Sequence, residues 1–498
     1  MLRGGGWLGM AALAQALLQI VIFAVLARLL SPTEFGLVAV AGIFVDLAAG
    51  VAAMGASQAL VQRRDLTRFH IRAAFWISML MGLVATAVLY GLSGWLAAVL
   101  GNPASAPLIA ALSFTFVIRA LGSVSEGLAA RRLLFRVLAV RQLAAYVLGY
   151  GVIGIGGAIL GLGAWALVYA QLTQVGIATL LLIAVVRFDC RPTIAWSAYR
   201  DILGFGTGFS VARIANSLAN QADRAIVSMN ASAAAVGLYT RALQITRYPS
   251  TMVGHVIEDV LFPSFSGVQT DLDRLRGAYS RSVGSIFVAL APLTVFFCLT
   301  AGPIADVLLG SQWSGAASLM IAFGVVIPIR SAQRICSALL RAVGRSWLVA
   351  GLQVFLFAGT TVGAVIGIKF GLLGTAIGVT VAFALHYLAS VIACKLALSL
   401  DGRQLLASHF AGLPLSLLVA IGAGTGMVAS ASDVIASPLA LVISTITCVA
   451  LTLAAVWFSP RFFLRPDGLW LSQLLFLKLP SKLSGQKLFK AFFRRMNK

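Results

Sequence analysis

Apolar residues fill long blocks of the 498-residue chain, and short polar or charged segments separate these blocks. Each block is close to the roughly 20 residues that an α-helix needs to cross a bilayer. Strands of a membrane barrel would alternate apolar and polar residues over shorter stretches. The pattern therefore predicts an all-α polytopic membrane protein with about 14 transmembrane helices. The predicted spans are 7–29, 36–61, 73–100, 105–130, 142–160, 163–186, 203–228, 236–262, 282–300, 314–340, 346–368, 371–395, 407–430 and 435–458.

Basic residues alternate between the connections that join these spans. Arginines cluster around 63–72, 131–141, 187–200 and 274–281, whereas connections such as 101–106 and 301–313 hold no Lys or Arg. Short cytoplasmic loops of membrane proteins are enriched in Lys and Arg. Only Arg28 and Lys369 depart from the alternation. We therefore expect both termini to be cytoplasmic.

Composition agrees with this architecture, because 60% of the residues are hydrophobic and only 10% are charged. An ordinary soluble domain is about 25% charged. The net charge is +22, and many of the Lys and Arg residues lie in the loops between apolar blocks, where they orient a membrane protein, so we predict no nucleic-acid partner. The tail 459–498 mixes Lys and Arg with Phe, Leu and Trp. It is predicted either to lie on anionic lipid of the cytoplasmic leaflet or to be a disordered basic tail.

The two halves of the chain resemble each other. The segment 96–101 is similar to 304–310, and each precedes a span with one central arginine, Arg119 or Arg330. The pattern predicts two pseudo-symmetric six-helix lobes related by an axis along the membrane normal, with the substrate between them. Apolar, glycine-rich spans also resemble one another by composition alone, so this alternative stays open. The predicted parts are a first lobe 1–186, a cytoplasmic linker 187–202, a second lobe 203–396, two further transmembrane helices 397–458 and the tail 459–498.

Ionisable side chains occur inside several spans, where burial costs about 2.5–3.5 kcal/mol per group on insertion scales. Cations predominate, and polar residues recur at helical spacing on the seventh, eighth and tenth spans. Arginine offers a planar fork of donors that suits phosphate. We therefore predict a cationic cavity for an anionic, phosphate-bearing substrate. The candidate binding residues are Arg119, Arg213, Asn216, Asn220, Asp223, Arg224, Arg241, Arg247, Arg330 and Arg334.

A structural interpretation of the same charges is nearly as strong for any single residue. Arg224 next to Asp223, and Arg119 near Glu126, are spaced for pairing within or between helices. Arg334 lies near a predicted membrane boundary, where its side chain can reach water. One shared aqueous cavity nevertheless accounts for cations on four separate spans.

Other motifs carry no chemistry. The glycines of 149–154 match a dinucleotide fingerprint, but they lie inside a predicted span without a preceding strand, which favours helix packing. Five cysteines and four histidines are scattered without metal-ligand spacing. The bare loops lack paired carboxylates. We therefore predict no enzyme activity, no metal and no cofactor.

Several segments resemble bacterial polysaccharide exporters and lipid-linked oligosaccharide flippases. The similar segments are 27–37 (ARLLSPTEFGL), 55–67 (GASQALVQRRDLT), 205–210 (FGTGFS), 218–224 (LANQADR), 236–241 (VGLYTR) and 261–264 (LFPS). This family belongs to the multidrug, oligosaccharidyl-lipid and polysaccharide exporter superfamily. The resemblance implies paired six-helix lobes that open alternately to either side of the bacterial inner membrane.

The resemblance also implies the substrate class. Such proteins move undecaprenyl-pyrophosphate-linked oligosaccharide or polysaccharide repeat units from the cytoplasmic to the periplasmic side, for exopolysaccharide, lipopolysaccharide or capsule biosynthesis. A glycan polymerase or chain-length protein is then a candidate partner. One alternative is a multidrug or cation exporter of the same superfamily, although 7–26 holds no acidic residue. A second is a membrane glycan polymerase or ligase, although no large external loop is predicted.

Overall fold

The computed structural model describes residues 18–52, 56–63, 65–267, 271–431, 437–460 and 462–463. Every regular element in these ranges is helical, as predicted. Ten helical segments of the described chain are long and apolar enough to cross a membrane. The protein is therefore a multi-pass helical membrane protein, while the number of 14 spans stays a prediction. Part of the first predicted span and almost all of the tail 459–498 lie outside the described residues.

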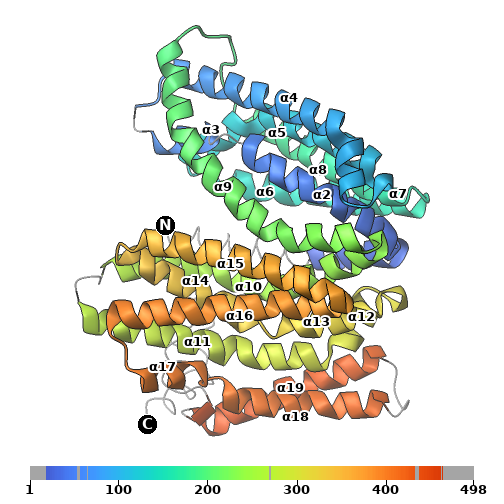
Figure 1. Cartoon of the computed structure of the whole chain (residues 1–498), viewed down its shortest axis with the longest axis vertical. Helices are drawn as coiled ribbons and strands as arrows, with labels where there is room; N and C mark the ends of the chain where they lie inside the picture. The colour runs from blue at the N-terminus through green and yellow to red at the C-terminus, as the bar shows by residue number, and fades with distance from the viewer. Residues whose placement is uncertain are drawn as a thin grey trace. The chain divides into compact units, whose positions relative to one another are not determined.

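The chain divides into two compact units, Met1–Thr240 and Arg241–Lys498. In the first unit, α9 packs against α2 and α4. The lobe boundaries predicted from the sequence stay a prediction. The helices of the first unit are Leu18–Leu29, α2 (Pro32–Ala52), α3 (Ala56–Gln62), α4 (Arg68–Val99), α5 (Ala106–Arg131), α6 (Phe135–Tyr146), α7 (Ile155–Ile159), α8 (Ala164–Val185) and α9 (Trp196–Asn230) (Figure 1).

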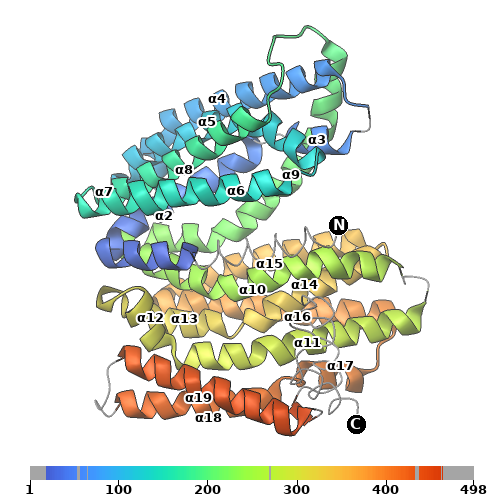
Figure 2. The same ribbon diagram turned by 180° about the vertical axis from the view of Figure 1, so that it is seen from behind.

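Helix α10 (Ala233–Gly267) begins in the first unit and continues into the second. Within the second unit α11 packs against α14 and α18, and α14 packs against α16. The two views show α18 and α19 side by side (Figures 1 and 2). The remaining helices are α11 (Leu272–Leu299), α12 (Ala301–Leu308), α13 (Ala316–Gly324), α14 (Ile327–Ala342), α15 (Ser346–Gly367), α16 (Gly371–Leu398), α17 (Gly402–His409), α18 (Leu413–Ala431) and α19 (Ser437–Phe458).

Local sequence signals fix several helix ends. Thr67 begins α4 with a capping box, in which its side chain accepts from the backbone N–H of His70 and the His70 ring accepts in return. Gly101 follows α4 with a φ of +69°, and Gly310 follows α12 with a φ of +95°. These are the two glycines that close the similar segments of the sequence. Glycine adopts positive φ without steric penalty, so both end a helix in the same way.

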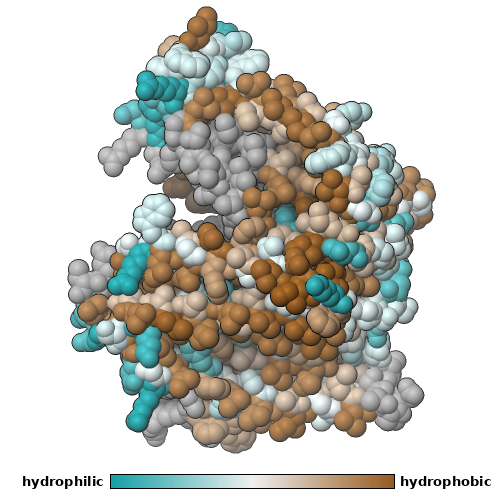
Figure 3. Space-filling view, in the orientation of Figure 1, coloured by the Kyte–Doolittle hydropathy of each residue, from teal (hydrophilic) through white to brown (hydrophobic). Residues whose placement is uncertain are grey.

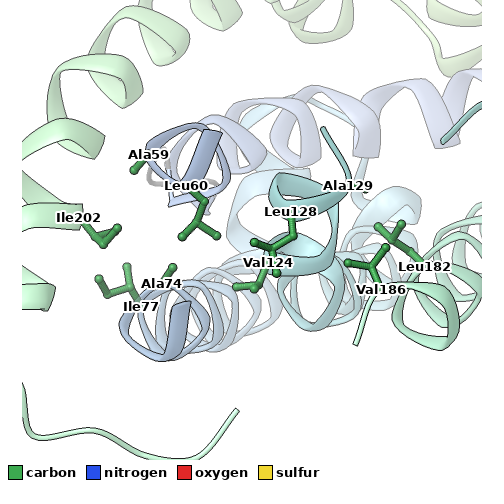
Figure 4. Close-up of a cluster of buried hydrophobic side chains, with 10 residues drawn as sticks. All are labelled: Ala59, Leu60, Ala74, Ile77, Val124, Leu128, Ala129, Leu182, Val186 and Ile202. Atoms are coloured by element: carbon green, nitrogen blue, oxygen red, sulfur yellow. The ribbon is translucent and has the colours of Figure 1, made fainter. Parts of the chain in front are cut away.

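The hydrophobic core of the first unit includes a cluster that lies between α3, α4, α5 and the end of α8. Leu60 of α3 packs with Ile77 of α4 and Leu128 of α5, and Ile202 of α9 joins them (Figure 4). All four side chains are buried. The cluster holds the start of α9 against α3 and α4, which positions the polar residues further along α9.

Small residues pack α15 against α16 in the second unit. A Cβ atom on Gly363 would lie 2.5 Å from the carbonyl oxygen of Gly378, and one on Gly367 would lie 2.3 Å from that of Gly374. Such spacing of glycines four residues apart allows backbones to approach closely, which replaces the hydrophobic driving force that is absent between helices in lipid.

The outer face of this helix pair is apolar. Val354 and Val362 of α15 and Ile377, Val381 and Leu385 of α16 are exposed. Hydrophobic side chains cover this surface, and hydrophilic residues gather toward the helix ends (Figure 3). A continuous apolar surface of this kind fits contact with lipid tails.

The glycines of 149–154 serve packing, which confirms the interpretation of this motif. They lie in a π-helical segment, Val147–Gly154, that continues α6. A Cβ atom on Gly149 would lie 2.6 Å from the carbonyl oxygen of Ala170 on α8. The absent side chain therefore lets α8 approach the backbone.

Candidate functional site

In the first unit, the polar residues of α9 meet a carboxylate of α2. The amide nitrogen of Gln221 donates to Asp46 Oδ2 at 2.5 Å, and its amide oxygen accepts from Arg224 Nη1 at 3.0 Å. Gln221 is buried, whereas Asp46 is exposed on the helix surface. One glutamine thus bridges an acidic and a basic side chain that come from different helices.

Two arginines share this carboxylate. Arg224 of α9 and Arg119 of α5 both lie close enough to Asp46 for an electrostatic interaction. Arg119 is exposed and Arg224 is half-buried. The structure thus brings together Arg119 and Arg224, two residues that the sequence predicted for the site, around an acidic residue that the predicted set did not include.

Asp223 contacts a different helix, α10. Its Oδ2 accepts from the hydroxyl of Tyr239 at 2.9 Å, and its Oδ1 accepts from the backbone N–H of Arg224 at 2.9 Å. Asp223 and Tyr239 are both buried. This carboxylate therefore ties α9 to the first turns of α10.

The structure describes the side chain of only one of the three remaining candidate residues of α9. Asn220 is exposed, one position before the buried Gln221. The side chains of Arg213 and Asn216 lie outside the described part of the structure.

In the second unit, α10 places Arg241, Gln244 and Tyr248 along one stripe. The Arg241 guanidinium donates to the Gln244 amide oxygen, and the Gln244 amide nitrogen donates to the Tyr248 hydroxyl at 3.0 Å. Arg247 is half-buried. Arg241 and Arg224 are thus both held by a glutamine three residues away on the same helix.

Helix α14 places Arg330 over an aromatic ring. The guanidinium carbon of Arg330 lies 4.0 Å from the ring centroid of Phe383 on α16. Stacking of this kind stabilises a cation by about 0.5–2 kcal/mol. Arg334 is half-buried one turn further on, and Gln333 donates to Ser337 at 2.9 Å. The polar stripe predicted on the tenth span therefore exists on α14.

The pairings weighed in the structural interpretation differ from those observed. Glu126 pairs with Arg141 at 2.6 Å, and the described contact of Arg224 with Asp223 runs through the backbone N–H. The guanidinium of Arg224 instead contacts Gln221.

Outside the apolar spans, ion pairs join the segment 187–202 to the start of α4 and to Arg63, which lies just before this helix. Arg63 Nη2 lies 2.8 Å from Asp201 Oδ2, and the His70 ring lies 3.3 Å from the same oxygen. Hydrogen bonding from His70 and the charge of Arg63 hold the pKa of Asp201 below its ordinary value. Arg72 donates to Asp189, and this hydrogen bond likewise lowers the pKa of Asp189.

Sequence reasoning placed three of the contacting residues outside the predicted site. Asp46 is an acidic residue within an apolar helix, Gln221 lies directly after Asn220 among the polar residues of α9, and Phe383 looks like any lipid-facing aromatic residue. A carboxylate inside an apolar span was a usable signal for Asp46. For Phe383 the sequence held no signal, because only the fold shows which ring an arginine covers.

Comparison with known proteins gives a family. The family model described as "Polysaccharide biosynthesis protein" matches residues 25–318. The succinoglycan biosynthesis transport protein ExoT of Rhizobium meliloti is 31% identical over 63% of this chain, and the match spans 63% of the length of ExoT. The lipopolysaccharide biosynthesis protein WzxC of Escherichia coli is 25% identical over 78% of this chain and 79% of its own.

Among solved structures, the lipid II flippase MurJ in an inward closed conformation is similar with a TM-score of 0.72. The two share 12% sequence identity, and the superposition covers 92% of this chain and 99% of the MurJ chain. At this identity the similarity concerns the fold.

Proposed function

Since the chain belongs to the polysaccharide biosynthesis protein family, we propose that it is a flippase for lipid-linked glycans. The substrate is an undecaprenyl-pyrophosphate-linked repeat unit, moved by alternating access from the cytoplasmic to the periplasmic side of the bacterial inner membrane. Relatives named for succinoglycan transport and lipopolysaccharide biosynthesis support this class, as does the fold shared with a lipid II flippase.

The observation that carries the proposal is the placement of arginines on otherwise apolar helices. Arg224 is held by Gln221 in the first unit, and Arg330 is held over Phe383 in the second. A fixed guanidinium has lost part of its conformational freedom before it binds, so each hydrogen bond to a phosphate oxygen gives a larger net gain. Taking each unit by itself, we assign Arg119 and Arg224 of the first unit, and Arg241 and Arg330 of the second, as candidate phosphate-binding groups.

The direction of transport agrees with the charge of this substrate. An inside-negative membrane potential favours outward movement of each negative charge by about 2.3 kcal/mol per 100 mV. The polyprenyl tail remains in lipid, where it needs no protein contact.

Export of a cationic drug is the less favoured alternative. A cation exporter needs an acidic residue that is available to its substrate. Two carboxylates are described in this part of the first unit: Asp46 already interacts with Arg224 and Arg119, and the buried Asp223 accepts from Tyr239. Both carboxylates already have described partners within the protein, which favours an anionic substrate over a cation.

The test replaces Arg330 by alanine or by lysine and measures glycan at the cell surface together with lipid-linked repeat units retained in the membrane. A hydrogen bond to a charged group contributes about 1.5–3 kcal/mol, so the alanine variant should reduce export by about tenfold or more. Lysine keeps the charge but loses the planar fork, so we expect partial export.

Arg274→Ala is the matched control, because the Arg274 side chain is 77% exposed and pairs with Asp271 at the start of α11. Its export should equal that of the wild type. Normal export by well-expressed Arg330→Ala and Arg224→Ala variants would contradict the assignment of these arginines to substrate binding. Normal export in a deletion strain contradicts the function as a whole.

A further inference from the structure

We propose that Asp46 is an internal counter-anion: it occupies Arg224 and Arg119 while no substrate is bound, and the anionic substrate displaces it. This inference rests on the proposed function, because it needs a substrate that carries a pyrophosphate. It assigns a role in affinity and release to a residue that binds no part of the substrate.

The geometry places Asp46 in competition for the arginines. Its carboxylate is joined to Arg224 through a single buried amide, that of Gln221, at 2.5 Å on one side and 3.0 Å on the other. Arg119 of α5 also interacts electrostatically with the Asp46 carboxylate. Two guanidinium groups therefore interact electrostatically with one carboxylate, and the group of three carries one net positive charge.

Asp46 differs in its exposure from Asp223, a carboxylate with a structural role. Asp223, one residue before Arg224, is buried and accepts from both Tyr239 and a backbone N–H. Asp46 is exposed, and its described hydrogen bond comes from a neutral amide. Breaking this contact removes one hydrogen bond from a neutral amide and leaves the Tyr239 contact of α9 intact, so an incoming anion displaces Asp46 at a lower cost than it would displace Asp223.

The larger charge of pyrophosphate explains why it displaces the Asp46 carboxylate from the arginines. A guanidinium within a membrane-spanning unit needs an anion nearby, and Asp46 supplies one negative charge. A pyrophosphate carries more charge and offers oxygens in pairs that match the guanidinium fork. The substrate therefore displaces the carboxylate, and the return of Asp46 to Arg224 assists release on the other side.

The test measures binding of inorganic pyrophosphate to the purified full-length protein by calorimetry at fixed ionic strength. Asp46→Asn should bind pyrophosphate about tenfold more tightly than the wild type, which is about 1.4 kcal/mol. The same variant should export less glycan, because release becomes slow. Asp46→Glu keeps the charge and should bind within about threefold of the wild type. Glu126→Gln removes one negative charge elsewhere in the same unit, where Glu126 pairs with Arg141, and should leave binding unchanged.

Each other outcome has one meaning. If Asp46→Asn binds no more tightly while Arg224→Ala loses binding, the counter-anion role is wrong and the proposed function stands. If Arg224→Ala and Arg119→Ala bind pyrophosphate as the wild type does, the proposed site itself is wrong. Asp46→Ser removes the charge with a smaller side chain and replaces Asp46→Asn if that variant does not purify as one species. If both fail to fold while Asp46→Glu folds, the carboxylate is structural and the inference is overturned.

Discussion

Replacing Gly237 by alanine tests the contact that positions Tyr239, the partner of Asp223. Gly237 lies in the first turns of α10, where a Cβ atom would be 2.0 Å from the carbonyl oxygen of Pro32 and 3.1 Å from the backbone nitrogen of Gly36. The reverse contact is equally close, because a Cβ atom on Gly36 would be 1.7 Å from the carbonyl oxygen of Ala233. The start of α2 and the start of α10 therefore touch through backbone alone.

The expected penalty follows from these distances. A Cβ atom essentially never lies within 3.0 Å of another heavy atom, so the two helices must separate by about the difference between 2.0 Å and 3.0 Å. Overpacking typically costs about 1–3 kcal/mol. Both partners are helix backbone and no side chain can rotate away, so we expect about 3 kcal/mol. The shift also moves Tyr239, which lies two residues further along α10.

The measurement compares apparent melting temperatures of detergent-purified protein at one fixed heating rate, since membrane proteins of this size unfold irreversibly. Gly42→Ala is the control on the same α2 helix, because a Cβ atom there would have nothing within 4 Å. It should be neutral or slightly stabilising, because alanine is the better helix former by about 1 kcal/mol. Equal melting of Gly237→Ala and the wild type would refute the backbone contact between α2 and α10.

Two further predictions concern other parts of the chain. Because Arg72 lowers the pKa of Asp189 below the ordinary 3.8, their ion pair should stabilise 187–202 above about pH 4 and be lost only as the pH falls through the lower folded value. The protection of 187–202 against hydrogen exchange, taken relative to intrinsic exchange at each pH, should stay constant from about pH 8 to pH 5 and fall in stronger acid. Arg72→Ala should raise exchange already at neutral pH, and unchanged exchange would contradict the pairing. Gly363→Ala should lower the melting temperature by separating α15 from α16, whereas Gly351→Ala, with open space at its Cβ, should not.

Hydropathy predicted where most helices lie, because crossing a bilayer demands long apolar segments whatever their packing. The predicted spans 73–100 and 163–186 correspond closely to α4 and α8. Breaks within spans were harder to predict. The span 314–340 is two helices, α13 and α14, and α14 begins at Ile327 with Pro328 in its first turn. Proline lacks the N–H that continues a helix, so Pro328 was the available signal.

Helical spacing predicted that polar residues of one span share a face, but it did not show which neighbour each residue meets. Polar residues were expected to recur at helical spacing on the eighth span, and the structure places two of them, Arg241 and Gln244, in contact. Arg330 was expected on a polar stripe, yet its contact with Phe383 depends on how α14 lies against α16. Contacts within one helix follow from sequence, whereas contacts between helices need the fold.

Asp223 and Arg224 show why this difference matters for the site. The two residues are adjacent and of opposite charge, so the sequence suggests that they neutralise each other. Successive residues of an α-helix point about 100° apart. Asp223 therefore meets Tyr239 of α10, while Arg224 meets Gln221 and, through it, Asp46 of α2. The carboxylate linked to Arg224 is thus the exposed Asp46 of another helix. An anion that displaces Asp46 therefore gains the interaction with the charge of Arg224.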